Sequence, residues 1–436
     1  MLKEAMPEGP RVIIDATFST MREREADDTG YGFLRDGAAV VGERKDYLAR
    51  LQRRTSVQPA PFATWSAGGR LITPGLVECH THLIFSGDRR TEFAELASGR
   101  NYSDLVWEGH GIFATVEATR AASEDELYSS ALRRLRWFVS GGVTTIETKS
   151  GYGLDVDNEL KMLRVARRLD EAGLARVKAT LLAGHVYPSQ IEPEDFIELI
   201  CSELIPQAHA GKLCDFVEAY CEETIGFSLD DASTLLEAAY KRKIPTRISA
   251  DHLSDSAGAA LAPAFYAKAA AHLNYTDDVA IEALASARTT AILLPIAHLE
   301  LGAKQRPPVD KLREAGVPIA ISTGCNPGTA PTTNLLTAAH LSCALFGLSP
   351  LEAIQGITVG AAKALGLSGV VGELTPGANA DFAIWDAEHP EDLIYWMGAP
   401  LCCSTWLSGS PVREFDSTQI PPINSVFLPT QEPITS

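Results

Sequence analysis

Short runs of β-branched and other apolar residues alternate with amphipathic segments of helical period through the middle of the chain. Segments 124–142 and 157–173 carry apolar residues at i, i+3, i+4 and i+7, and each ends in glycine. Strand-like runs occupy residues 76–83, 143–149, 176–185, 214–221, 245–251, 269–275, 289–295 and 317–323. Strands and helices in this alternation are typical of an α/β protein with a parallel (β/α)8 TIM-type barrel, predicted here over residues 71–368.

The two ends of the chain follow another pattern. Residues 1–70 and 369–436 carry short strand-like runs, such as 11–18 and 381–386, with no helical segments between them. Neither end is long enough to form a sizeable sheet alone. We therefore predict one small composite β-sandwich domain that is built from both chain ends.

The amino-acid composition and net charge of the chain exclude several classes of protein. Hydrophobic residues make up 45% of the 436 residues and charged residues 22%, which excludes a disordered chain. The formal net charge of −18 argues against nucleic-acid binding. The N-terminal pattern predicts no secretory leader, no apolar run is long enough to span a membrane, and the eight cysteines form no CxxC pair. We expect a cytoplasmic protein with a small anionic substrate and neither nucleic-acid nor membrane partners.

Histidines gather where the predicted barrel strands end. His80 and His82 end the first strand, and four more, His185, His252, His272 and His298, lie in or directly after later strands. The carboxyl ends of barrel strands carry the active site in enzymes of this fold. Residues i and i+2 of a strand face one side, so His80 and His82 can share a divalent metal ion.

Several segments resemble the imidazolonepropionase family within the amidohydrolase superfamily. The similar segments are PGLVECHTHLIF, FSGDRRTEF, GVTTIETKSGYG, YCEETIGFS, NPGTAPTTNL and VGELTPGANADFAIWD, which span about residues 70–390. The resemblance implies a hydrolase with a barrel, a composite β-domain and a homodimeric assembly. It also implies one metal ion, held by the strand-1 histidine pair, a strand-5 histidine and a strand-8 aspartate.

The chain departs from this pattern at the implied metal site. The strand-5 ligand position holds Ser249, the strand-8 position holds Gly324, and the neighbouring acid/base glutamate is replaced by His252. Two histidines alone make a poor zinc site, because protein zinc sites use three or four protein ligands. We expect no cofactor. The alternative is a single zinc or iron ion on His80 and His82, completed by one of His185, His252 or Cys325.

The family's substrate-binding positions are retained. The resemblance assigns substrate binding to Arg89, Tyr102, Tyr152, His185, Asn326, Gly328 and Thr329, and His110 and His298 are further candidates near the rim. Arg89 can hold a carboxylate through two parallel hydrogen bonds, and the backbone N–H groups of Gly328 and Thr329 can complete that contact. The predicted catalytic residues are Cys325, His252, His272, His80 and His82. Cys325 is either a thiolate nucleophile or a small buried hydrophobe.

Three functions fit these residues. The first is a desulfhydrase of 3-(5-oxo-2-thioxoimidazolidin-4-yl)propionate, in the breakdown of thio-histidine compounds such as ergothioneine. There, attack at the ring carbon between the nitrogens expels sulfide. A metal would hinder this reaction, because sulfide and thiocarbonyl groups bind zinc tightly. The second is imidazolonepropionase of histidine degradation with a rebuilt metal site, which breaks a ring C–N bond. The third is a non-catalytic ligand-binding homologue.

Overall fold

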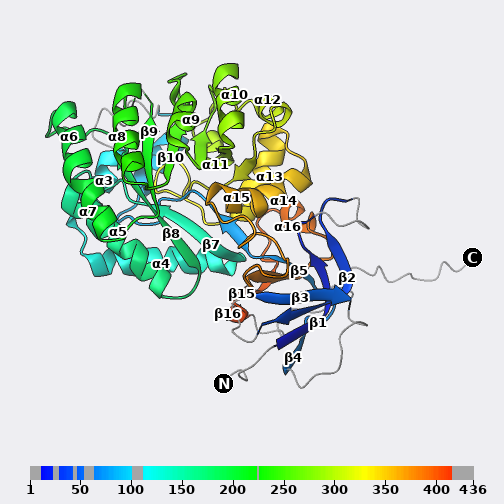
Figure 1. The fold of residues 1–436 in the computed structure, drawn as a ribbon. Helices are drawn as coiled ribbons and strands as arrows, with labels where there is room; N and C mark the ends of the chain where they lie inside the picture. Colours follow the sequence, from blue (N-terminus) through cyan, green and yellow to red (C-terminus); the bar gives the residue numbers. More distant parts are fainter. Residues whose placement is uncertain are drawn as a thin grey trace, which may run out of the picture.

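The computed structural model describes residues 11–22, 29–42, 47–53, 63–100, 111–222 and 225–414. Figure 1 shows two parts, a group of strands with helices packed around it and a separate sheet formed by the first and last strands. No helix within these ranges is long and apolar enough to cross a membrane. The predicted fold class, a TIM-type barrel with a β-domain made from both ends, is confirmed.

The barrel strands are paired in sequence order, and every pair is parallel. They are β6 (Leu76–Glu78), β7 (Val143–Lys149), β8 (Arg176–Gly184), β9 (Phe216–Cys221), β10 (Thr246–Ala250), β11 (Ala269–His272), β12 (Thr290–Leu293) and β13 (Ile319–Ile321). Each lies within one of the predicted strand runs. Most of their side chains are buried on both faces, as expected when helices cover the outer face of a parallel sheet that curves into a barrel.

Helices surround the barrel, as Figure 1 shows. The longer ones are α3 (Ile112–Ala121), α4 (Glu124–Ser140), α5 (Val156–Glu171), α8 (Leu229–Lys241), α10 (Asp278–Ala287) and α13 (Leu335–Phe346). Shorter ones are α1 (Arg90–Ala97), α6 (Pro193–Leu199), α7 (Ile205–Ala210), α9 (Ala262–Phe265), α11 (Pro295–Glu300), α12 (Val309–Glu314), α14 (Pro350–Gly356), α15 (Val359–Ala364) and α16 (Asp392–Tyr395). Helix α4 begins at a capping box of Ser123 and Glu126, which satisfies two backbone donors of the first turn.

The second sheet joins the two ends of the chain. It contains β1 (Arg11–Ser19), β2 (Phe33–Val41), β3 (Leu48–Arg53), β4 (Ala63–Ser66), β5 (Leu71–Pro74), β14 (Phe382–Trp385), β15 (Cys402–Leu407) and β16 (Ser410–Glu414). Strand β5 pairs with β1 on one side and with β14 on the other. Because β5 leads directly into β6, the sheet and the barrel are connected at the first barrel strand.

A buried carboxyl group bridges the first and last barrel strands. Glu78, at the end of β6, accepts hydrogen bonds from the backbone N–H and hydroxyl of Thr323, at 3.0 and 2.8 Å. It also accepts from the hydroxyl of Ser322 and from the backbone N–H of His80. Burial raises the pKa of Glu78 to about 7. These bonds hold the start of the predicted histidine motif against the end of β13.

Gly142 forms the contact between the β-domain and the entry to β7. Its φ is +89°, and a side chain there would place its Cβ 2.5 Å from the indole of Trp385. Trp385 is fully buried and donates its indole N–H to the Thr73 hydroxyl at 2.8 Å. Only glycine meets both requirements at this position.

We predict that Gly142→Ala destabilises the protein more than Gly173→Ala. Both positions have positive φ, at +89° and +66°, but no atom lies within 4 Å of a Cβ at Gly173. The control should lose about 1 kcal/mol through backbone strain, and Gly142→Ala about 2–4 kcal/mol because it also overpacks against Trp385. Thermal unfolding of both variants measures the difference. Equal losses would contradict the proposed role of this contact.

Candidate active site

A cavity of about 780 Å³ opens where the barrel strands end. The predicted residues in its lining are His80, His82, Arg89, Tyr152, His185, Ser249, His252, His272, Gly324, Asn326 and Thr329. They come from the ends of most barrel strands and from the loops that follow. Residues far apart in the sequence therefore meet in one cavity, as the barrel geometry requires.

Charged residues in the barrel interior pair with one another below the cavity. The ammonium group of Lys149 donates to Glu147 at 2.7 Å and to Glu218 at 2.6 Å, and all three side chains are buried. Arg247 contacts Glu218 at 3.2 Å and donates to the Cys79 carbonyl at 2.7 Å. We call Glu147, Lys149, Glu218 and Arg247 the interior ion network. It contains two cations and two carboxylates, so the buried charges balance.

His80 and His82 lie above this network with their rings 5.8 Å apart. Burial lowers the pKa of both imidazoles well below the ordinary value, and the positive charge of Lys149 lowers them further. His82 stacks on His185 at 5.3 Å, and the pKa of His185 is lowered to about 4 by burial. The Nδ1 of His185 lies 2.8 Å from the Gly151 carbonyl, which places the proton on Nδ1 and leaves Nε2 as an acceptor.

His252 and His272 form a second pair, which adjoins the first because the His272 ring lies 6.0 Å from the ring of His80. Their rings stack at 3.9 Å with an angle of 21° between planes. Burial lowers the pKa of His252 to about 4 and that of His272 well below its ordinary value. His272 has φ +73°, a conformation that costs a non-glycine residue about 1–2 kcal/mol. Backbone strain of this kind is concentrated at functional sites, which supports a role for His272 in the chemistry.

Arg89 lies in the cavity wall and is held by Glu92. Its Nε donates to Glu92 at 2.8 Å, and a second bond joins Nη2 to the same carboxylate. The Nη1 side of the guanidinium packs on Gly328, where an added Cβ would lie 2.1 Å from Nη1. Glu92 therefore fixes one edge of Arg89, and the Nη1 side lies so close to the Gly328 backbone that a larger residue at position 328 would collide with it.

The loop after β13 differs from the prediction in one detail. The backbone N–H groups of Gly328 and Thr329 both donate to the Asn326 side-chain oxygen at 2.8 Å. The Asn326 amide nitrogen donates to the Gly324 carbonyl at 2.9 Å and to the Thr329 hydroxyl at 3.0 Å. These internal bonds preform the loop, but they use the donors that were predicted to hold the substrate carboxylate.

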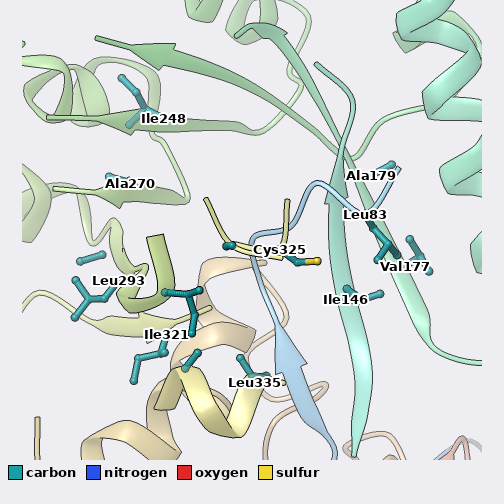
Figure 2. Packing of buried hydrophobic residues seen from close by; sticks show 14 of the residues in the cluster. Leu83, Ile146, Val177, Ala179, Ile248, Ala270, Leu293, Ile321, Cys325 and Leu335 are labelled. Carbon is teal, nitrogen blue, oxygen red and sulfur yellow. The ribbon is translucent and has the colours of Figure 1, made fainter. Parts of the chain in front are cut away.

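Cys325 does not lie in the cavity lining, contrary to the prediction that it is the nucleophile. Its side chain belongs to the hydrophobic core, where Figure 2 shows the sulfur directed toward Leu83 and Ile146. Burial raises the pKa of the thiol to about 12, so the thiolate is rare at neutral pH. The chain turns at Gly324, where φ is +64°, and this turn directs the next side chain away from the cavity. The structure supports the alternative interpretation, a small buried hydrophobe.

Besides Cys325, four predicted site residues are not in the described lining of the cavity. The first, Gly328, packs against Arg89. Tyr102 and His110 lie outside the described residues. His298, on α11, is not part of the lining and packs its ring against Phe346 at 5.1 Å. His298 is thus a helix-packing residue in this structure.

Several residues in or beside the cavity were not singled out from the sequence, among them Tyr220 and Glu218. Tyr220 lines the cavity, and its hydroxyl lies 2.9 Å from Nδ1 of His252. Glu218 accepts the Ser249 hydroxyl at 2.7 Å. Both lie on β9 at i and i+2, so the alternation of the run FVEAYC already places them on one face.

The residues do not fit the metal ion that the family pattern implies. Gly324 has no side chain, and the Ser249 hydroxyl donates to Glu218, so only His80 and His82 remain of the four ligand positions. No group of three or more histidine, cysteine, aspartate or glutamate side chains in the described ranges has the geometry to hold a metal ion. We therefore assign no catalytic step to a metal.

Comparisons with known proteins agree with this architecture. The model of the amidohydrolase family matches residues 71–412. A protein from Ralstonia nicotianae named imidazolonepropionase is 44% identical over 392 residues, 89% of this chain and 95% of the relative. Another imidazolonepropionase, from Pseudomonas syringae pv. tomato, is 47% identical over 337 residues, 77% of this chain and 84% of the relative.

Solved structures share the fold at lower identity. An adenosine deaminase from Xanthomonas campestris with bound zinc has a TM-score of 0.68 and 18% identity, and the match covers 92% of each chain. A 5-methylcytosine deaminase from Klebsiella pneumoniae has a TM-score of 0.71 and 18% identity, over 94% of this chain and 99% of that one. At this identity the likeness extends to the fold alone.

We predict that zinc binding can be restored by supplying the two missing ligands. The double variant Ser249→His/Gly324→Asp should bind about one zinc per chain after dialysis, because it completes a set of four protein ligands. The original protein, with two ligands, should retain well below one zinc per chain. Elemental analysis of both proteins measures the metal content. One tightly held zinc in the original protein would show that the described residues form a site that we have not recognised.

We also predict that Cys325 resists thiol reagents in the folded protein. Its side chain is 3% exposed and its pKa is raised to about 12, whereas Cys201, Cys214, Cys343 and Cys403 are partly exposed. Maleimide treatment at pH 7.5 followed by peptide mass spectrometry should label the partly exposed cysteines first. Cys325 should react only after denaturation. Preferential labelling of Cys325 in the native state would restore it as a candidate nucleophile.

Proposed function

The chain belongs to the amidohydrolase family, and from this membership we propose that it acts on a five-membered imidazolone-type ring bearing a propionate arm. The observation that carries this proposal is one cavity that holds Arg89 together with the aromatic side chains of the two histidine pairs. Arg89 suits the carboxylate of the arm, and the flat rings suit a planar heterocycle. The chain is a hydrolase by family, and relatives that share 44–47% identity carry the name imidazolonepropionase.

The reaction we propose begins with water at the ring carbon between the two nitrogens. Water needs a base at this point, and His252 and His272 are neutral at pH 7 because burial lowers the pKa of each. A neutral imidazole can accept the proton as the C–O bond forms. The interior ion network does not compete for this role, because its carboxylates already accept from Lys149 and Arg247.

Two substituents at that carbon define two candidate substrates. With hydrogen there, the adduct collapses by breaking a ring C–N bond, and the names of the relatives support this imidazolonepropionase reaction. With a thioxo group, the C–S bond breaks instead, and water and substrate give the hydantoin and hydrogen sulfide. No relative reported above carries a desulfhydrase name. The observation that favours the thioxo ring is the loss of two metal-ligand positions, because this reaction has a good leaving group and is hindered by zinc.

Assembly and location stay predictions from the sequence and from the resemblance. We propose a homodimer in the cytoplasm that acts on a small anionic substrate, with neither nucleic acid nor membrane as a partner. The net charge of −18 supports the absence of nucleic-acid binding.

Purified protein should be incubated separately with imidazolonepropionate and with its 2-thioxo analogue. Loss of the ring absorbance follows the first reaction, and sulfide release follows the second. We expect turnover of at least one ring, and the ratio of the two kcat/KM values identifies the substrate. Failure to convert either ring, by protein shown to be folded, would refute the proposed function.

We predict that Arg89→Ala raises KM by about 10–150-fold and lowers kcat far less. A charge-assisted pair of hydrogen bonds to a carboxylate contributes about 1.5–3 kcal/mol, and the arm lies away from the reacting carbon. Arg90→Ala is the matched control, because the neighbouring Arg90 side chain is 87% exposed and pairs with Asp88. Steady-state kinetics of both variants test this. An unchanged KM in Arg89→Ala would mean that another group holds the propionate.

A further inference from the structure

Tyr220 and His252 are in contact across the cavity wall. Tyr220 lies on β9, is 7% exposed, and has its hydroxyl 2.9 Å from Nδ1 of His252. Its ring lies 5.9 Å from that of His272 and 6.2 Å from that of His185. The Tyr220 ring therefore lies beside His272 and His185, and its hydroxyl contacts His252.

The backbone around His252 is fixed by its own set of bonds. Asp251 has φ +53°, and its carboxylate accepts from the hydroxyls of Ser256 and Thr276 at 2.9 and 2.8 Å. Glu222 accepts the backbone N–H of His252 at 3.2 Å, and Asn274 donates to the His252 carbonyl at 3.0 Å. These bonds hold the main chain in place. Which nitrogen of the His252 ring carries the proton therefore depends on the contacts of the ring itself.

The contacts of the His252 ring engage Nδ1 and leave Nε2 for the substrate. One face of the His252 imidazole stacks on His272, and Nδ1 meets the Tyr220 hydroxyl. A phenol is a stronger hydrogen-bond donor than a neutral imidazole N–H, and an imidazole nitrogen is a stronger acceptor than a phenol oxygen. The favoured arrangement has Tyr220 O–H donating to Nδ1, which places the imidazole proton on Nε2.

We propose that Tyr220 is a positioning residue that holds neutral His252 with its proton on Nε2, so that His252 donates a hydrogen bond to the reacting ring. This inference rests on the proposed function and deepens it. The donated bond stabilises the negative charge that develops on the ring nitrogen or sulfur when water attacks. His252 keeps its proton in this role, and His272 is left to accept the proton of the water. The ring hydroxyl of Tyr220 thus acts through His252 and does not touch the reacting carbon.

The tautomer of His252 tests the contact without any need for turnover. Nitrogen-15 labelling of histidine gives separate signals for the two ring nitrogens, and His252→Gln identifies the signals of His252 by their loss. We expect protonated Nε2 and hydrogen-bonded, unprotonated Nδ1 in the original protein. Tyr220→Phe should shift these signals, whereas Tyr240→Phe should not, because Tyr240 is 46% exposed on α8. A proton on Nδ1, or signals unmoved in Tyr220→Phe, would overturn the proposal.

Kinetics test the consequence for the reaction. Tyr220→Phe keeps the ring and should lower kcat at least about tenfold while KM changes less than about threefold. The double variant Tyr220→Phe/His252→Gln should be no slower than His252→Gln, because both residues supply one donor. Full activity of a folded Tyr220→Phe, or additive losses, would overturn the proposal. Failure of the original protein to convert either ring would refute the proposed function, and the tautomer signals would still decide the Tyr220 contact.

Discussion

Pairing within the interior ion network is the constraint on which the site depends. An unpaired charge in the barrel interior costs several kcal/mol, so Lys149 must reach both Glu147 and Glu218. This requirement fixes β7 against β9 across β8, and Arg247 adds β10 to the same set. Once these strands are in place, the cavity residues at their ends have defined positions. Ion pairing therefore determines the arrangement of the strands beneath the cavity, and the strand ends determine where the cavity residues lie.

The same network determines the protonation state of the histidines above it. Burial disfavours the imidazolium form, and the positive charge of Lys149 disfavours it further for His80, His82, His185 and His272. The cavity consequently offers neutral rings that accept or donate hydrogen bonds with little charge of their own. In these surroundings the ion pair of Arg89 with Glu92 brings a guanidinium group into the wall of a cavity otherwise lined by neutral imidazoles. Under the proposed function, Arg89 binds the carboxylate of the substrate and the neutral histidines carry the proton transfer.

The sequence predicts the barrel well, because strand and helix periods alternate and each strand is buried on both faces. It also predicts which strand ends contribute to the cavity, since residues such as His80 and His82 follow the simple alternation of a strand. The prediction fails for Cys325, where a turn at Gly324 with φ +64° reverses the direction of the next side chain. Tyr220 could have been found by alternation with Glu218, but its bond to His252 depends on a loop whose conformation the sequence does not show.

The sheet made from both chain ends has a consequence for synthesis on the ribosome. Strand β5 lies between β1 and β14, and β14 begins at residue 382 of a 436-residue chain. Until β14 emerges, buried residues such as Leu71 and Ile72 have one open edge beside them, although the barrel strands that follow are already available to pair. The nascent chain must therefore hold an incomplete, aggregation-prone edge while all the barrel strands are synthesised, and the native pairing of β5 is completed only after β14 has emerged.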